Sequence, residues 1–149
     1  MELRSVEELM DLLYACRGSW GAPGLRSRRV DLHQHALQTA ALLRRRRPAD
    51  KELQVAGLVH AIGPLLRPGD ESSHPECAAD AVRGLLGERV ARLVREQHRG
   101  GLPADEDLQH LRQADEEGRT VGFDAGVLED WRTVLELVAA RNSRLGAVD

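Results

Sequence analysis

The sequence predicts an all-α fold, a single bundle of about six or seven helices. Apolar residues recur at helical spacing along most of the chain, and capping, glycine and proline signals divide it into segments of helix length. β-Branched and aromatic residues are few and do not alternate as strands require. Because 149 residues can bury one good core but are too few for two ordinary domains, we expect one domain over 1–149.

Capping residues open the first three expected helices, and polar loops or proline end them. These helices run from Val6 to near Arg17, over 32–47 and over 51–62, with caps at Ser5 (with Glu8), Asp31 and Asp50. Pro48 stops the second helix, and Gly63 with Pro64 ends the third. Segments 18–24 and 65–72 are expected to be loops.

The second half of the chain continues the helical pattern. Ser73 and Glu76 form a capping box for a helix that reaches Gly87, and further helices are expected over 88–98, 104–118 and 125–143. The last is long, and its expected buried side carries Val127, Leu128, Trp131, Val134, Leu135 and Val138.

Composition and charge exclude several functional classes. No apolar stretch approaches the length of a membrane span, and the acidic N-terminus does not resemble a signal peptide, so we expect a cytoplasmic protein without membrane contact. A net charge of -3 and only 3% aromatic residues argue against a nucleic-acid partner.

The histidines are the main candidates for chemistry, because imidazole is the commonest side-chain ligand for zinc and iron. In a helical bundle, histidines near helix ends can converge on one interior cavity. Four occupy such positions: His35, His60, His74 and His98. The remaining two, His33 and His110, are interpreted as packing or surface residues.

The order and spacing of these four histidines resemble the HD-domain metalloprotein superfamily. The matching stretches are DLHQHALQTAALL, LVHAIGP, HPECAADAV and VREQHRGG. The similarity is closest to the predicted HD phosphohydrolases, a group that includes the mixed-valent di-iron oxygenases that cleave organophosphonates. It covers about residues 30–101 well, and the C-terminal helices over 105–142 would complete the bundle.

The resemblance implies a set of site residues. His35, His60, His74 and His98 would bind metal, and Gln38 and Arg99 would contact a small phosphorylated or phosphonate ligand. The comparison also shows that several of the superfamily's site residues are missing in this sequence. Ala61 stands where the superfamily has the bridging aspartate of its His-Asp pair. Pro64 replaces a second histidine, and Gly100, Gly101 and Leu102 stand where a basic residue is expected. Asn142 is the nearest counterpart of the last metal aspartate, with Asp130 as the alternative.

These losses favour a divergent HD-domain protein with an incomplete metal site, without the phosphohydrolase or oxygenase activity of its relatives. It would retain at most weak metal or anion binding, with one divalent ion, iron or zinc, or none. One alternative is an active mononuclear metal-dependent phosphohydrolase or oxygenase. A second is a helical partner-binding module, in which Arg44 to Arg47, with Arg26, Arg28 and Arg29, form a basic patch.

Overall fold

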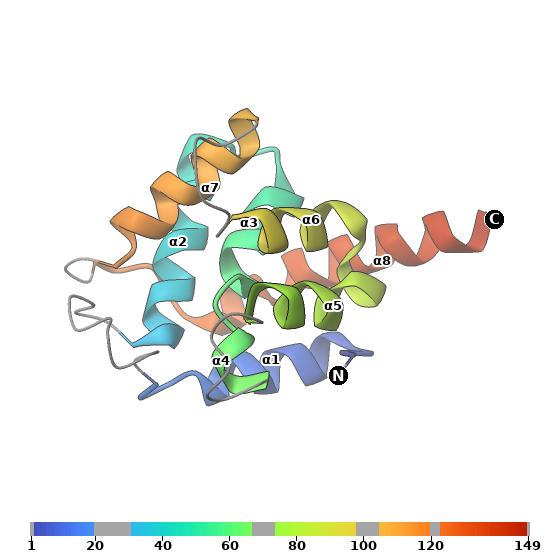
Figure 1. The fold of residues 1–149 in the computed structure, drawn as a ribbon, viewed down its shortest axis with the longest axis horizontal. Coiled ribbons are helices and arrows are strands. Elements are labelled where there is room, and N and C mark those ends of the chain that lie inside the picture. Colours follow the sequence, from blue (N-terminus) through green and yellow to red (C-terminus); the bar gives the residue numbers. More distant parts are fainter. Residues whose placement is uncertain (1, 20–30, 67–73, 98–104, 120–122, 149) are drawn as a thin grey trace.

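The computed structural model describes residues 2–19, 31–66, 74–97, 105–119 and 123–148, and within them the chain is all-helical (Figure 1). The predicted all-α class is confirmed, with eight α-helices and one short 3₁₀ helix in these residues and no strand. The elements are α1 Val6–Ala15, α2 Leu32–Arg46, α3 Lys51–Val59, α4 Gly63–Leu66, α5 His74–Leu86, α6 Glu88–Glu96, α7 Glu106–Glu117, η2 Leu128–Trp131 and α8 Arg132–Val148.

Helix α3 lies at the centre of the fold. It contacts α2, α6, α7 and α8, and every residue from Leu53 to Val59 is buried (Figure 1). A helix with mostly apolar residues on every side is stable only when it is surrounded by other elements. The residue that follows α3, His60, is therefore held inside the molecule.

The outer helices pack around this centre. Helices α5 and α6 pair closely, α4 packs on α5, and α7 lies against α2. Helix α8 begins beside α1 and η2, and its C-terminal end projects beyond the body (Figure 1). Among the residues described, no helix is both long enough and apolar enough to cross a membrane.

The predicted caps at Ser5, Asp31 and Asp50 are confirmed. Their side-chain oxygens accept hydrogen bonds from the backbone N–H of Glu8, Gln34 and Leu53, at 3.1, 2.8 and 3.1 Å. Ser73, the fourth predicted cap, lies outside the described residues.

Two predicted boundaries are wrong. Residues Gly63–Leu66 form a helical turn rather than the start of a loop, because Pro64 is tolerated in a first turn, where the N–H groups need no helical partner. The last helix does not run unbroken from 125, since Gly126 has a φ of +81° and Asp130 accepts a hydrogen bond from the N–H of Val127. Val127 is accordingly exposed, not buried as predicted.

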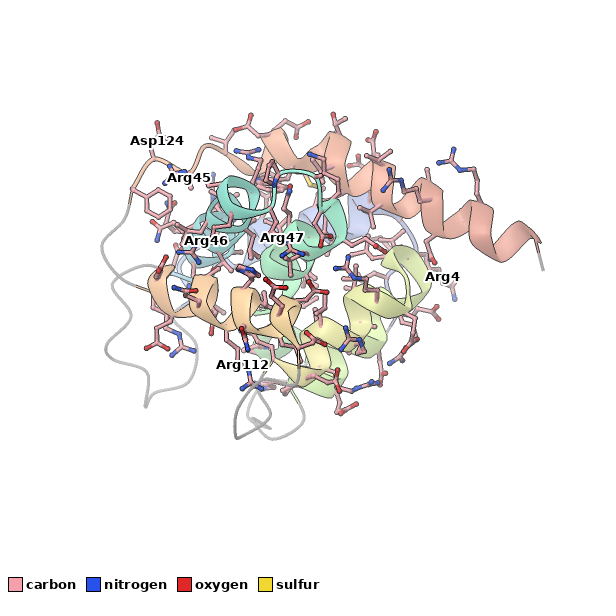
Figure 2. The ribbon with its side chains drawn as sticks, turned by 90° about the horizontal axis from the view of Figure 1, so that it is seen from above. Arg4, Arg45, Arg46, Arg47, Arg112 and Asp124 are labelled. Carbon is pink, nitrogen blue, oxygen red and sulfur yellow. The ribbon has the colours of Figure 1, made fainter. Side chains whose placement is uncertain are left out.

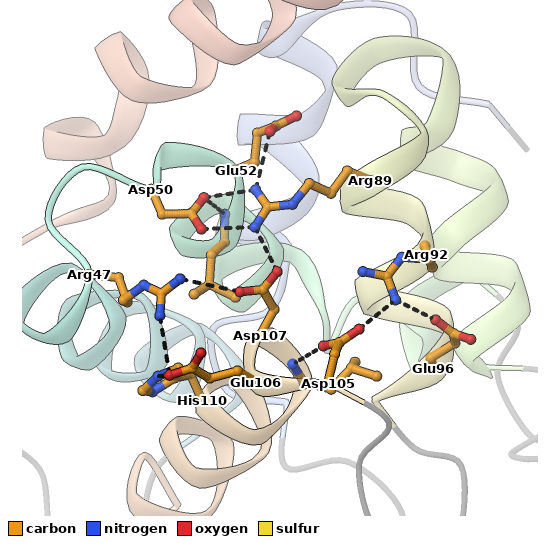
Figure 3. Close-up of polar contacts among 12 residues, drawn as sticks. Arg47, Asp50, Glu52, Arg89, Arg92, Glu96, Asp105, Glu106, Asp107 and His110 are labelled. Carbon is orange, nitrogen blue, oxygen red and sulfur yellow. Dashed lines mark hydrogen bonds and ion pairs between the residues drawn. The ribbon is translucent and has the colours of Figure 1, made fainter.

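A network of ion pairs joins α3, α6 and α7 (Figure 3). The guanidinium of Arg89 on α6 donates to both carboxylate oxygens of Asp50 at 2.8 Å and to Asp107 of α7 at 3.0 Å. The hydrogen bond from Arg89 is the largest contribution that lowers the pKa of the Asp50 carboxyl from its ordinary 3.8. Asp50 thus caps α3 and also ties it to α6.

Replacing Asp50 with asparagine should separate these two roles. Asparagine caps helices about as well as aspartate, so the variant loses mainly the charged pair, at a cost of about 1–2 kcal/mol at pH 7. Because the pKa is lowered in the folded state, the carboxylate stabilises the fold above pH 3.8, and this contribution is lost as the pH falls below that value. Urea unfolding at pH 7, 5 and 3 should therefore show wild type and Asp50→Asn converging at acid pH.

Asp105→Asn is the matched control. Asp105 caps α7 and pairs with Arg92 through one bond of 3.1 Å at a more exposed position, so its substitution should cost less. An Asp50→Asn effect that stays constant from pH 7 to pH 3 would contradict the charge-pair interpretation.

Candidate metal site

Three polar side chains from distant parts of the chain meet in the interior. His35 lies in the first turns of α2, His60 caps the C-terminus of α3, and Asp115 lies near the end of α7. Their residues are 0%, 3% and 6% exposed. Buried polar groups of this kind must find partners within the protein or bind a ligand.

The three side chains share one point of contact. The Nε2 atoms of His35 and His60 lie 2.7 and 2.8 Å from the same oxygen, Oδ1 of Asp115, and 3.2 Å from one another. This is the group of His, Cys, Asp and Glu side chains in the described residues whose ligand atoms are close enough to hold a metal ion.

The protonation of His60 follows from its other neighbour. Its Nδ1 lies 2.5 Å from the carbonyl oxygen of Gly57, and a carbonyl only accepts, so Nδ1 carries a hydrogen and donates it. The neutral ring then has a lone pair on Nε2, directed at the Asp115 carboxylate. Two electron-rich atoms at that distance need a positive group beside them, which can be a hydrogen on Nε2 of His35 shared between them, a second proton on His60 or a metal ion.

The charge of Asp115 is stabilised by its surroundings. Burial raises the pKa of its carboxyl, but a doubly protonated, cationic His60 and the hydrogen bonds from the two histidines lower it by more, so that in this protonation state the net pKa lies well below the ordinary value. Its second oxygen, Oδ2, accepts a hydrogen bond of 2.9 Å from Nη2 of Arg119. The carboxylate is therefore ionised, as a metal ligand must be.

The spacing of the ligand atoms fits a single ion. Ligand atoms about 2.0–2.1 Å from one ion are about 2.9 Å apart in octahedral geometry and about 3.3–3.4 Å apart in the tetrahedral geometry usual for Zn²⁺. The observed separations of 2.7, 2.8 and 3.2 Å bracket the octahedral value. Non-haem ferrous sites use the same ligand set, in which two histidines and one carboxylate occupy one face of the iron ion.

The structure brings together two of the four histidines expected to bind metal. His35 and His60 meet, whereas His74, half-buried at the start of α5, is not part of this group. The backbone of His74 lies against α4, so close that a Cβ on Gly63 would be 2.6 Å from the Cβ of His74. His98 and Arg99 lie outside the described residues.

Gln38, expected to contact a ligand, has protein partners instead. Its Nε2 donates to the carbonyl of Gly118 at 3.0 Å, and its Oε1 accepts from the N–H of Phe123 at 3.1 Å. Its amide therefore joins α2 to the chain after α7, and we assign it a structural role.

Neither residue considered for the last metal aspartate lies at this site. The amide of Asn142 donates to the carbonyl of Gly84 at 2.8 Å, between α8 and α5. Asp130 accepts from the N–H of Val127 at the start of η2. The carboxylate that reaches the histidines is instead Asp115 of α7, one helix earlier in the chain.

The sequence does not distinguish Asp115 from the other acidic residues of the helix expected over 104–118. The prediction fell on the last helix instead, with Asn142 as the nearest counterpart and Asp130, beside Trp131, as the alternative.

The basic run at the end of α2 is largely used within the fold (Figure 2). Arg46 pairs with Glu117 and Arg47 with Asp107, both on α7. The guanidinium of Arg44 lies 4.7 Å from the ring centre of Trp131, and that of Arg45 lies 5.2 Å from that of Phe123. These contacts give the run a packing role, and they weaken the hypothesis of a partner-binding patch.

Comparison of the chain with protein-family models and with curated proteins finds no match.

Proposed function

We propose that this chain is a divergent HD-domain protein that binds one divalent metal ion, iron or zinc, through His35, His60 and Asp115. In this proposal it does not carry out the two-metal chemistry of that superfamily, because Ala61 supplies neither the charge nor the oxygen of a bridging carboxylate. The resemblance of the histidine motifs and the all-helical fold support the superfamily assignment.

One observation carries the metal-binding part of the proposal. The N–H of His60 Nδ1 is committed to the Gly57 carbonyl, so the Nε2 lone pair faces the Asp115 carboxylate. A proton or a metal ion can satisfy this arrangement, and a backbone carbonyl on the far side of a histidine is the usual way to orient a metal ligand.

Metal uptake tests the proposal directly. Apo-protein prepared by dialysis against EDTA is incubated with Zn²⁺ or, without oxygen, with Fe²⁺, then desalted and analysed for metal per chain. Wild type should retain about one equivalent, since two histidines and a carboxylate suffice for a mononuclear site. His60→Gln should retain almost none.

His33→Gln is the matched control. His33 is also buried and its Nδ1 also lies near a backbone carbonyl, 2.9 Å from that of Leu13, but it does not belong to the cluster. It should retain the wild-type equivalent. Wild type without bound metal, or His60→Gln with a full equivalent, would refute the proposal.

A second candidate is an active mononuclear phosphohydrolase or oxygenase. The number of ligands favours this candidate, because three protein ligands leave one coordination position for water or substrate. Catalytic zinc sites have the same arrangement of three protein ligands and one open position. A bound metal would supply Lewis acidity there and lower the pKa of a coordinated water. Hydrolysis of p-nitrophenyl phosphate by the zinc-loaded protein, or consumption of oxygen with a hydroxyphosphonate by the iron-loaded protein, each absent in His60→Gln, would favour this candidate.

A further inference from the structure

The two oxygens of the Asp115 carboxylate have different partners. Oδ1 faces His35 and His60, whereas Oδ2 accepts a hydrogen bond of 2.9 Å from Nη2 of Arg119. The carboxylate is buried, so turning away from these partners would leave its charge without compensation. Oδ1 is therefore the oxygen that faces an ion held by the histidines.

The end of α7 is fixed against α2 just before Arg119. Gly118 packs so closely on α2 that a Cβ there would lie 2.7 Å from Oγ1 of Thr39, a contact that any larger residue would disturb. The carbonyl of Gly118 also accepts the hydrogen bond from Gln38. Since Thr39 is one helical turn after His35, the docked end of α7 brings Arg119 to the cluster in a defined position.

Arg119 also supplies a positive charge next to the carboxylate. Its side chain is 31% exposed, and a guanidinium keeps its charge while Nη2 holds Oδ2. A carboxylate that bridges two metal ions, or chelates one large ion, uses both of its oxygens. With Oδ2 held by arginine, neither mode is open to Asp115.

We propose that Arg119 is a positioning residue that restricts Asp115 to coordination through one oxygen. The site thereby favours small transition-metal ions over larger, oxygen-preferring ions such as Mn²⁺ and Ca²⁺. This inference rests on the proposed metal site, and it adds a determinant of which metal that site selects.

Arg119→Ala tests the inference, with Arg119→Lys as the conservative variant. Apo-proteins are titrated with Co²⁺, followed by visible absorption, and with Mn²⁺ in competition. Loss of a residue that orients a ligand typically lowers metal affinity about 10–100-fold. Arg119→Ala should show such a loss for Co²⁺, a smaller loss for Mn²⁺ and an altered Co²⁺ spectrum. Arg119→Lys should restore the spectrum, because an ammonium group can also donate to Oδ2.

Arg46→Ala is the matched control, since Arg46 is similarly exposed and pairs with Glu117 of the same helix α7. It should keep the wild-type Co²⁺ affinity and spectrum, and far-UV circular dichroism of every variant checks that the helices are retained. Equal losses in Arg46→Ala and Arg119→Ala would overturn the inference, because the effect would then come from a general loosening of α7.

The remaining outcomes separate this inference from the proposed function. If wild type binds Co²⁺ and Arg119→Ala binds it within about twofold, with the same spectrum and the same preference over Mn²⁺, the inference fails and the metal site stands. If wild type binds no Co²⁺ at all, both fail.

Discussion

Asp115→Asn should lower the affinity for Zn²⁺ by more than about 100-fold, because removing even a residue that only orients a ligand commonly costs 10–100-fold. The amide keeps the size of the side chain but loses the negative charge that the ion would neutralise. Isothermal titration of the apo-proteins measures the difference. Thermal unfolding with and without Zn²⁺ gives a second readout, since an ion that binds only the folded state stabilises it by about 2.7 kcal/mol at 100 times its Kd.

The same substitution should have little effect on the metal-free protein. The N–H of the introduced side-chain amide can donate to the Nε2 lone pair of a neutral His60, so the cluster is satisfied without a cation. We expect a change of about 1 kcal/mol or less in the free energy of unfolding in EDTA. Asp115→Ala offers no donor and should cost more under the same conditions.

Asp80→Asn serves as the control, because it removes a carboxylate that pairs with Arg83 at the exposed surface of α5. Its affinity for Zn²⁺ should equal that of wild type. An Asp115→Asn protein with wild-type affinity would exclude the carboxylate from the metal site.

Trp131→Ala should destabilise the protein by about 3–5 kcal/mol, the usual cost of removing a large buried aromatic side chain. Trp131 is fully buried at the end of η2, and the Arg44 guanidinium covers its ring. Urea unfolding followed by circular dichroism measures the loss. Leu137→Ala, at a partly exposed position of α8, should change stability by less than about 1 kcal/mol.

Trp131→Phe distinguishes packing from hydrogen bonding at this position. The indole Nε1 is buried and meets no acceptor within the described part of the chain, so phenylalanine removes an unsatisfied donor along with part of the ring. It should cost about 1–2 kcal/mol, less than alanine. A phenylalanine variant as unstable as the alanine variant would show that the indole N–H has a partner.

Local features of the fold could be predicted from the sequence. Ser5, Asp31 and Asp50 cap their helices through bonds that span only three residues, so the sequence contains all that determines them. The turn at Gly63–Leu66 and the break before η2 were missed. The turn was missed because Pro64 was interpreted as a helix stop, although proline is also tolerated in the first turn of a helix. The break was missed because the backbone N–H of Val127 donates to the side chain of Asp130, which replaces a helical arrangement there.

The site could be predicted only in part. His35 and His60 belong to helices that are neighbours in sequence, and the chain has six histidines, so a motif can single them out. The chain has 24 acidic residues, most of which are plausible on a solvated helix face. Asp115 differs from them only through the docking of α7 on α2, which Gly118 and Gln38 determine at long range.

The separation of the three cluster residues along the chain has a consequence for the order in which the protein folds. His35 and His60 are 25 positions apart, whereas Asp115 is separated from them by 80 and 55. Contacts of short separation form early and distant ones late, so α2 and α3 can pair before α7 docks. During synthesis the two histidines emerge well before their carboxylate. We therefore expect the cluster to be completed in the last folding steps, so that a metal ion bound there would stabilise the finished fold rather than start its formation.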